Sequence, residues 1–260
     1  ARIAGMGAEQ SGGQEHVVLD LGTGVRALGQ RMLARFGPQV PQTYHVFLSH
    51  LHWDHIMGLP FFTPVYIPGN RIVVHTCHPH AEFALRRQQA EPSFPVRFDY
   101  FSASFTFHVA TPGEPFEIDG TQVVAHAQRH AGDSYGWRFD RSGKSIVYST
   151  DSEHRLEDED ERQGFIAFFD QADVVVFDAM YSLADAISVK ADWGHSSNIV
   201  GVELCQAARV KRLVMFHHEP AYSDTQIAQI LDETRRFEQI TRDGHTLEVL
   251  SAWDGLELVV

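Results

Sequence analysis

The sequence predicts a mixed α/β fold in which helices accompany sheets with a large antiparallel portion. Short apolar runs rich in β-branched residues recur along the chain, and turn residues or polar clusters bound each of them, as is typical of strands. Amphipathic segments alternate with these runs over the second half, whereas residues 94–147 are mainly strand-like. This combination favours layers of helix and sheet.

Eight runs are predicted as strands, and five amphipathic segments as helices. The strands are HVVLDLG (16–22), YHVFLSH (44–50), RIVVHT (71–76), TQVVAHA (121–127), KSIVYSTD (144–151), DVVVFDA (173–179), KRLVMFHH (211–218) and TLEVLS (246–251). The helices are residues 25–36, 80–89, 160–170, 196–208 and 224–240, and Ser223 or Asp224 can cap the last one. Because we find no repeat, low-complexity block or linker, we expect residues 1–260 to form a single domain, with an atypical Gly-rich start over residues 1–15.

The composition is that of a globular protein with a large core. Hydrophobic residues make up 43% of the 260 residues and charged residues 21%. No apolar run reaches the roughly 18 residues of a membrane-spanning helix, and no secretory leader is visible. Cys77 and Cys205 are too few for a disulfide framework, so we expect a reducing, cytoplasmic location without membrane contact.

The charge balance limits the class of partner. Acidic residues outnumber basic ones by 34 to 21, which gives a net charge of −13. Because phosphate neutralisation by basic side chains dominates nucleic-acid affinity, a long polynucleotide is disfavoured, whereas a small anionic substrate is not. The 16 histidines are the other unusual feature, since histidine is the commonest metal ligand and proton carrier near neutral pH.

Four predicted strands end in a histidine or an aspartate. These residues are His50, Asp151, Asp178 and His217. Ligand sites in α/β folds lie outside the carboxyl ends of strands, so we expect the four side chains to converge on one pocket.

The segment SHLHWDH (49–55) gives the strongest chemical signal. His50 and His52 are two residues apart and point the same way on an extended chain, so both can bind one metal ion. Asp54 and His55 follow on a turn and could serve a second ion. Imidazole and carboxylate ligands suit zinc, and also manganese or iron. A histidine-rich surface loop is the weaker interpretation, because a buried strand leads into this spacing.

These motifs resemble those of the metallo-β-lactamase superfamily. LDLGTG (19–24) and SHLHWDH are followed in family order by HAGDSYGWRF (130–139), YSTD (148–151) and RLVMFHHEP (212–220), with Thr150 where the family usually has glycine. The resemblance covers residues 17–222 and implies a four-layer αββα sandwich with a metal site at one edge of the sheets.

The resemblance also implies a centre of two divalent ions, most simply zinc. One ion would be held by His50, His52 and His130, the other by Asp54, His55 and His217, and Asp151 would bridge them. His126 is an alternative to His130, although the H-x-x-x-S-x-G spacing from His130 fits the family better. His218 would contact substrate or be structural, and Ser134 is a second candidate substrate contact.

Two further motifs resemble the tRNase Z and phosphodiesterase branch. VVFDAMYS contains Asp178 where the branch usually has glutamate, and DWGHSS contains His195. In that branch an acid–histidine pair helps to protonate the leaving group, so we expect Asp178 and His195 to be catalytic residues. Asp54 of the SHLHWDH motif is expected to be the third catalytic residue. A carboxylate on one imidazole nitrogen fixes the tautomer and stabilises the protonated ring. The structural alternative is that Asp178 forms a turn and His195 caps the following helix.

The resulting hypothesis is a dinuclear metal-dependent phosphodiesterase that acts on a small phosphodiester, such as a cyclic nucleotide or an aryl ester. A metal-bridged hydroxide would attack phosphorus, and His195 would protonate the departing oxygen. The basic, Gly-rich arm with which tRNase Z holds tRNA has no counterpart here, and Arg86, Arg87 and Arg129 are scattered candidate anion contacts. A lactonase or β-lactamase-like hydrolase and a non-catalytic metal-binding sensor are the alternatives. The resemblance also suggests a homodimer.

Overall fold

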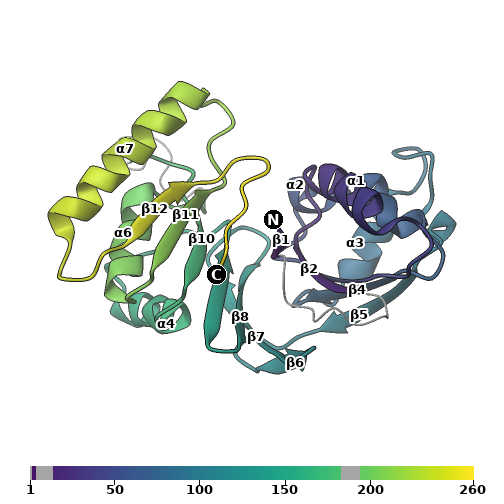
Figure 1. The fold of residues 1–260 in the computed structure, drawn as a ribbon, viewed down its shortest axis with the longest axis horizontal. Coiled ribbons are helices and arrows are strands. Elements are labelled where there is room, and N and C mark those ends of the chain that lie inside the picture. The colour runs from purple at the N-terminus through teal and green to yellow at the C-terminus, as the bar shows by residue number, and fades with distance from the viewer. Residues whose placement is uncertain (1, 4–13, 183–193) are drawn as a thin grey trace. The chain divides into compact units, whose positions relative to one another are not determined.

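The computed structural model describes residues 2–3, 14–182 and 194–260. The chain divides into two compact units, residues 1–111 and 112–260, and each unit combines one β-sheet with its own helices (Figure 1). The mixed α/β class expected from the sequence is therefore confirmed. The expectation of a single domain over residues 1–260 stays a prediction.

The first unit contains a five-stranded sheet in the order β1-β2-β3-β4-β5. Strands β2 to β5 are parallel, and β1 pairs antiparallel with β2 at the edge. The strands are β1 (Arg2–Ile3), β2 (Glu15–Leu19), β3 (Thr43–Phe47), β4 (Arg71–Thr76) and β5 (Ser104–Val109). Of the Gly-rich start, Arg2–Ile3 form an edge strand, and residues 4–13 lie outside the described residues.

Helices of the first unit pack on one face of this sheet. They are α1 (Val25–Phe36), α2 (Trp53–Ile56) and α3 (Ala81–Gln88), with 3-10 turns at Leu59–Phe61, Thr63–Tyr66 and Phe98–Tyr100. Met32 of α1 and Leu85 of α3 share a core with Val46 of β3 and Val74 of β4. Because side chains alternate along a strand, the neighbouring positions of β3 and β4 face the other way.

The second unit contains a seven-stranded mixed sheet in the order β12-β11-β10-β9-β8-β7-β6. Strands β6 to β9 form an antiparallel meander, and β9 to β12 are parallel. They are β6 (Phe116–Ile118), β7 (Thr121–Gln128), β8 (Ser134–Arg141), β9 (Lys144–Ser149), β10 (Val174–Asp178), β11 (Arg212–Phe216) and β12 (Glu248–Ser251). The mainly strand-like prediction for residues 94–147 is confirmed.

Three helices of the second unit pack together against its parallel strands: α4 (Glu159–Phe169), α6 (Asn198–Ala207) and α7 (Asp224–Thr241) (Figure 1). Ser223 caps α7, since its hydroxyl accepts from Gln226 N. The Gln226 side-chain oxygen accepts in turn from Ser223 N. This cap and all five predicted helices are confirmed within one or two residues at each end. None of the helices in the described part of the chain is long and apolar enough to cross a membrane.

Candidate metal centre

In the first unit, the histidine cluster is organised by a buried aspartate. Asp20 follows β2 with a φ of 55°, and its two oxygens accept from Ser49 N at 2.7 Å and Ser49 Oγ at 2.8 Å. His55 Nδ1 lies 2.8 Å from the same carboxylate. Burial raises the pKa of Asp20, but His55 and Ser49 outweigh burial, so the net shift is downward and the group is a carboxylate.

The donors and acceptors of this network determine which ring nitrogen of His50 and of His55 carries the proton that is donated within it. Asp20 only accepts, so Ser49 Oγ and His55 Nδ1 both donate to it. With its one proton committed to Asp20, Ser49 Oγ accepts from His50 Nδ1 at 3.0 Å. His50 and His55 therefore carry a proton on Nδ1, and in the neutral ring this leaves Nε2 as the atom that can bind a metal ion. Asp20 lies inside the LDLGTG segment, yet its role was not predicted from the sequence.

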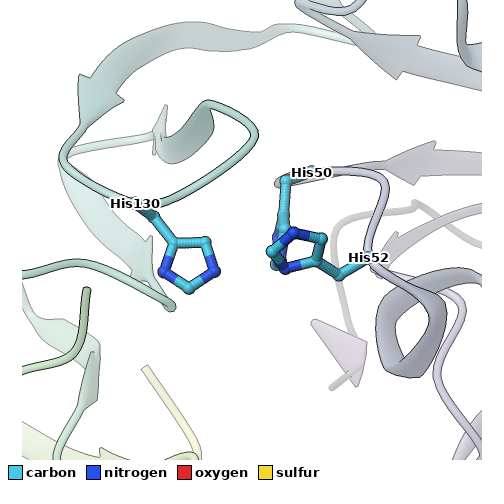
Figure 2. A group of neighbouring side chains, drawn as sticks. All are labelled: His50, His52 and His130. Carbon is cyan, nitrogen blue, oxygen red and sulfur yellow. The ribbon is translucent and has the colours of Figure 1, made fainter. Parts of the chain in front are cut away.

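The His50 and His52 side chains lie side by side, with ring centroids 4.5 Å apart (Figure 2). His50 is buried and His52 is exposed. His55 Nε2 lies 3.2 Å from Asp54 Oδ2, and Asp54 is exposed on the short helix α2. The sequence-predicted ligands of the first unit thus form two neighbouring pairs, one of two imidazoles and one of imidazole with carboxylate.

A close backbone approach holds α2 in place. Gly58 N donates to Leu21 O and Leu21 N donates to His55 O, both at 2.7 Å. A Cβ atom on Gly58 would clash with the Gly22 carbonyl and lie 2.7 Å from Leu21 O. Only glycine allows the segment that bears Asp54 and His55 to pack this tightly on the loop after β2.

Replacing Gly58 by alanine is expected to lower the free energy of unfolding by about 1–3 kcal/mol, because the new methyl group must displace backbone. Urea unfolding followed by circular dichroism measures this change. Gly24→Ala is the matched control, since a Cβ atom there has nothing within 4 Å. Equal unfolding midpoints for the two variants would contradict the close approach.

In the second unit, three neighbouring parallel strands deliver polar groups to their carboxyl ends. Asp178 ends β10, Asp151 follows β9 by two residues, and His217 follows β11 directly. Asp151 and His217 adopt left-handed backbone conformations, with φ of 46° and 57°. His217 Nε2 lies 3.3 Å from Asp151 Oδ2. The predicted convergence of strand ends holds for these three residues, and His50 belongs to the first unit.

His130 lies on the loop after β7 (Figure 2). Its Nδ1 donates to Gly194 O at 2.8 Å, which leaves Nε2 as the ligand atom of the neutral ring, and this atom lies 3.9 Å from Asp151 Oδ2. His126 is placed differently, because its ring stacks on Phe168 at 4.8 Å. This placement favours His130 as the ligand. The Gly194 carbonyl is a further functional group without a sequence signal, and a Cβ atom at this position would lie 2.7 Å from His130 Nδ1.

His195 forms a hydrogen-bonded pair with Asp178. The distance from His195 Nδ1 to Asp178 Oδ2 is 2.9 Å, and the carboxylate is fully buried. Asp178 also accepts from Ser152 N at 3.0 Å and Met180 N at 3.1 Å, which fixes its position. His195 belongs to two groups of candidate ligand atoms that lie within 4.8 Å of one another, one with His130 and Asp151 and one with Asp178 and His217. Asp192 and Trp193 of the DWGHSS motif lie outside the described residues.

The two candidate substrate contacts are both held by protein groups. His218 Nε2 lies 3.0 Å from Ser251 Oγ of β12, and burial lowers the pKa of His218. Ser134 is buried and donates to Thr150 O at 3.4 Å, a position that suits support of the Asp151 segment better than substrate contact. Arg86 and Arg129 are each held in ion pairs, with Glu82 and Asp99 for the first and Glu161 for the second.

The family model for the beta-lactamase superfamily domain matches residues 15–218 of this chain. The chain belongs to the beta-lactamase superfamily. The match contains all seven predicted metal ligands and both residues of the acid–histidine pair.

The chain is also similar to three individual proteins. An uncharacterized protein of Mycobacterium leprae is 32% identical over 52% of this chain, a match that spans about half (47%) of that protein's own length. The Ribonuclease Z of Crocosphaera subtropica is 22% identical over 85% of each chain. The metallo-beta-lactamase fold protein YhfI from Bacillus subtilis has a TM-score of 0.65 at 16% identity, with 92% of this chain and 84% of that chain covered. The fold of this superfamily member is therefore of the metallo-β-lactamase type.

The donor set within each unit fits divalent metal ions. His50, His55 and His130 each donate from Nδ1 to a protein acceptor, which leaves Nε2 as the ligand atom. Imidazole nitrogen together with carboxylate oxygen suits zinc, manganese and iron better than calcium or magnesium, which prefer oxygen ligands.

Proposed function

We propose that this beta-lactamase superfamily member is a metal-dependent phosphodiesterase with a dinuclear centre. His50, His52 and His130 would hold one ion, Asp54, His55 and His217 the other, and Asp151 would be shared. The observation that carries the phosphodiesterase assignment is the His195–Asp178 pair, which lies next to Asp151 and His217 within the second unit.

The metal ions and the His195–Asp178 pair would have different roles in the reaction. Bound divalent ions supply an activated water at neutral pH and offset negative charge on a phosphoryl oxygen. Asp178 holds His195 by its Nδ1 atom and fixes the orientation of the ring, so the opposite nitrogen, Nε2, would be the atom that gives a proton to the departing alkoxide.

The substrate class follows from charge and from the relatives. The net charge of −13 disfavours a long polynucleotide, and a small phosphodiester, such as a cyclic nucleotide or an aryl phosphodiester, is compatible with it. Ribonuclease Z, by its name an enzyme that acts on RNA phosphodiester bonds, is similar over 85% of this chain, which supports phosphodiester chemistry in general.

A substrate panel tests this proposal. Protein loaded with zinc or manganese would be assayed with bis(p-nitrophenyl) phosphate, an acyl-homoserine lactone and a chromogenic β-lactam, and its metal content would be measured in parallel. Turnover of the phosphodiester above the other two supports the proposal. Turnover of the carbonyl substrates alone would replace it with a lactonase or lactamase. Two bound ions without turnover of any compound would identify a metal-binding sensor.

A further inference from the structure

The segment 194–197 of the second unit carries His195 and also the Gly194 carbonyl that orients His130. Gly194 O accepts from His130 Nδ1, and His195 donates to Asp178. Ser197 caps the N-terminus of α6, where its hydroxyl accepts from Val200 N at 3.4 Å. The position of His195 therefore depends on what anchors this segment at Ser196.

Ser196 is anchored by a histidine outside the predicted site. Its hydroxyl lies 2.7 Å from Ser152 O and 2.5 Å from Nδ1 of His154. A hydroxyl has one proton, and the Ser152 carbonyl can only accept, so Ser196 donates to Ser152. His154 Nδ1 is then the donor to Ser196 Oγ.

The surroundings of His154 are apolar. Its ring lies 4.2 Å from the Phe165 ring and 4.8 Å from the Phe177 ring, measured between centroids. Burial lowers the pKa of His154 to about 3, so the imidazole is neutral near pH 7. With the proton on Nδ1, the Nε2 atom is a buried acceptor that has no hydrogen-bond partner among the described residues.

This arrangement is unfavourable for packing alone. A phenylalanine would fill the space between Phe165 and Phe177 without burying an unsatisfied nitrogen, which costs stability. The histidine brings one property that a hydrocarbon ring lacks, the Nδ1–H donor directed at Ser196. The hydrogen bond to the segment 194–197 therefore explains why this position holds a histidine.

We propose that His154 is a positioning residue, which holds the segment 194–197 through Ser196 so that His195 stays on Asp178. Ser152 connects the acid to this segment, because its N–H donates to Asp178 and its carbonyl accepts from Ser196. The loop after β9 is thereby joined both to the acid and to the segment that bears its histidine. The catalytic consequence rests on the proposed function, whereas the structural one does not.

Four variants test the inference: His154→Phe, His154→Asn, Ser196→Ala and the double variant His154→Phe/Ser196→Ala. Asparagine places an amide donor close to the position of Nδ1, whereas phenylalanine keeps the ring and removes the donor. We expect His154→Phe to lower kcat roughly 10–100-fold with little change in KM, because small displacements of a catalytic group have effects of this size. His154→Asn should recover most of the loss, and the double variant should be no worse than the worse single variant, because both changes break one connection.

His126→Phe is the matched control, because the His126 ring also packs on Phe165 and stacks on Phe168, away from the hydrogen bonds of the segment 194–197. A second readout needs no turnover. Nitrogen-15 NMR of labelled histidines should show His154 as a neutral Nδ1–H tautomer, and a downfield proton from His195 Nδ1–H on Asp178 that weakens in His154→Phe and persists in His126→Phe.

The outcomes separate the two proposals. If the NMR signals change as described but neither the wild-type protein nor any variant has phosphodiesterase activity, the inference stands and the proposed function fails. Wild-type kcat in His154→Phe together with an unchanged His195 signal would overturn the inference, as would fully additive losses in the double variant. If His154→Phe does not fold, Ser196→Ala is measured in its place. An unchanged His195 signal in Ser196→Ala also overturns the inference.

Discussion

Replacing His195 by alanine is expected to lower kcat for an alkyl phosphodiester by roughly 10²–10⁴-fold, the usual contribution of a positioned general acid. The physical reason is that the departing oxygen would leave as an alkoxide without a proton donor. His195 is not among the seven proposed metal ligands, so both metal ions should remain bound. Steady-state kinetics with elemental analysis of the same samples measures the two effects together.

The size of this loss should depend on the leaving group. An ester of an acidic phenol leaves readily without a proton, so the loss should be smaller for p-nitrophenyl esters than for alkyl esters. His245→Ala serves as a control, because His245 is a half-buried histidine of the same unit whose Nε2 lies 2.7 Å from the Val210 carbonyl and which is not a candidate metal ligand. A His195→Ala variant with wild-type kcat on an alkyl ester would exclude His195 as the acid.

Replacing Asp151 by alanine is expected to abolish binding of at least one ion and to lower activity by more than about 100-fold, since even groups that only orient metal ligands contribute 10–100-fold. Asp151 is buried, and one of its oxygens lies 3.3 Å from His217 Nε2 and 3.9 Å from His130 Nε2. Its removal leaves these two imidazoles without the carboxylate between them. Metal content after dialysis and isothermal titration with zinc measure the loss.

Asp232→Ala is the control for this change, because Asp232 is an exposed acid on α7. Two ions per chain in Asp151→Ala, bound as tightly as in the wild type, would show that Asp151 is not the shared ligand. The assignment of a dinuclear centre would then need a different bridging group.

Replacing Asp20 by asparagine is expected to weaken metal affinity by roughly 10–100-fold while the ligands themselves stay in place. The reason is that an amide cannot accept from both Ser49 and His55 as the carboxylate does, so the tautomer of His55 is no longer fixed. Competition with a chromogenic chelator measures the affinity. An unchanged dissociation constant would mean that Ser49 alone orients the two histidines.

The sequence by itself indicated most of the elements and much of the candidate ligand set. The five helices follow from local periodicity and capping, as at Ser223, and these are properties of neighbouring residues. The spacing of His50, His52, Asp54 and His55 is also local, so their joint use as ligands could be predicted. Strand ends mark Asp151, Asp178 and His217 in the same way, because the end of an apolar run is visible in one dimension.

Only the tertiary structure decided which groups orient these ligands. Asp20 precedes His55 by 35 residues, Gly194 follows His130 by 64, and Ser196 follows His154 by 42. Each pair is brought together by the pairing of distant strands, for which no local pattern exists. The choice between His126 and His130 is of the same kind, since it depends on whether β7 has ended. Periodicity describes which face a residue occupies, whereas the partner on that face comes from a remote part of the chain, and only the folded sheet determines it.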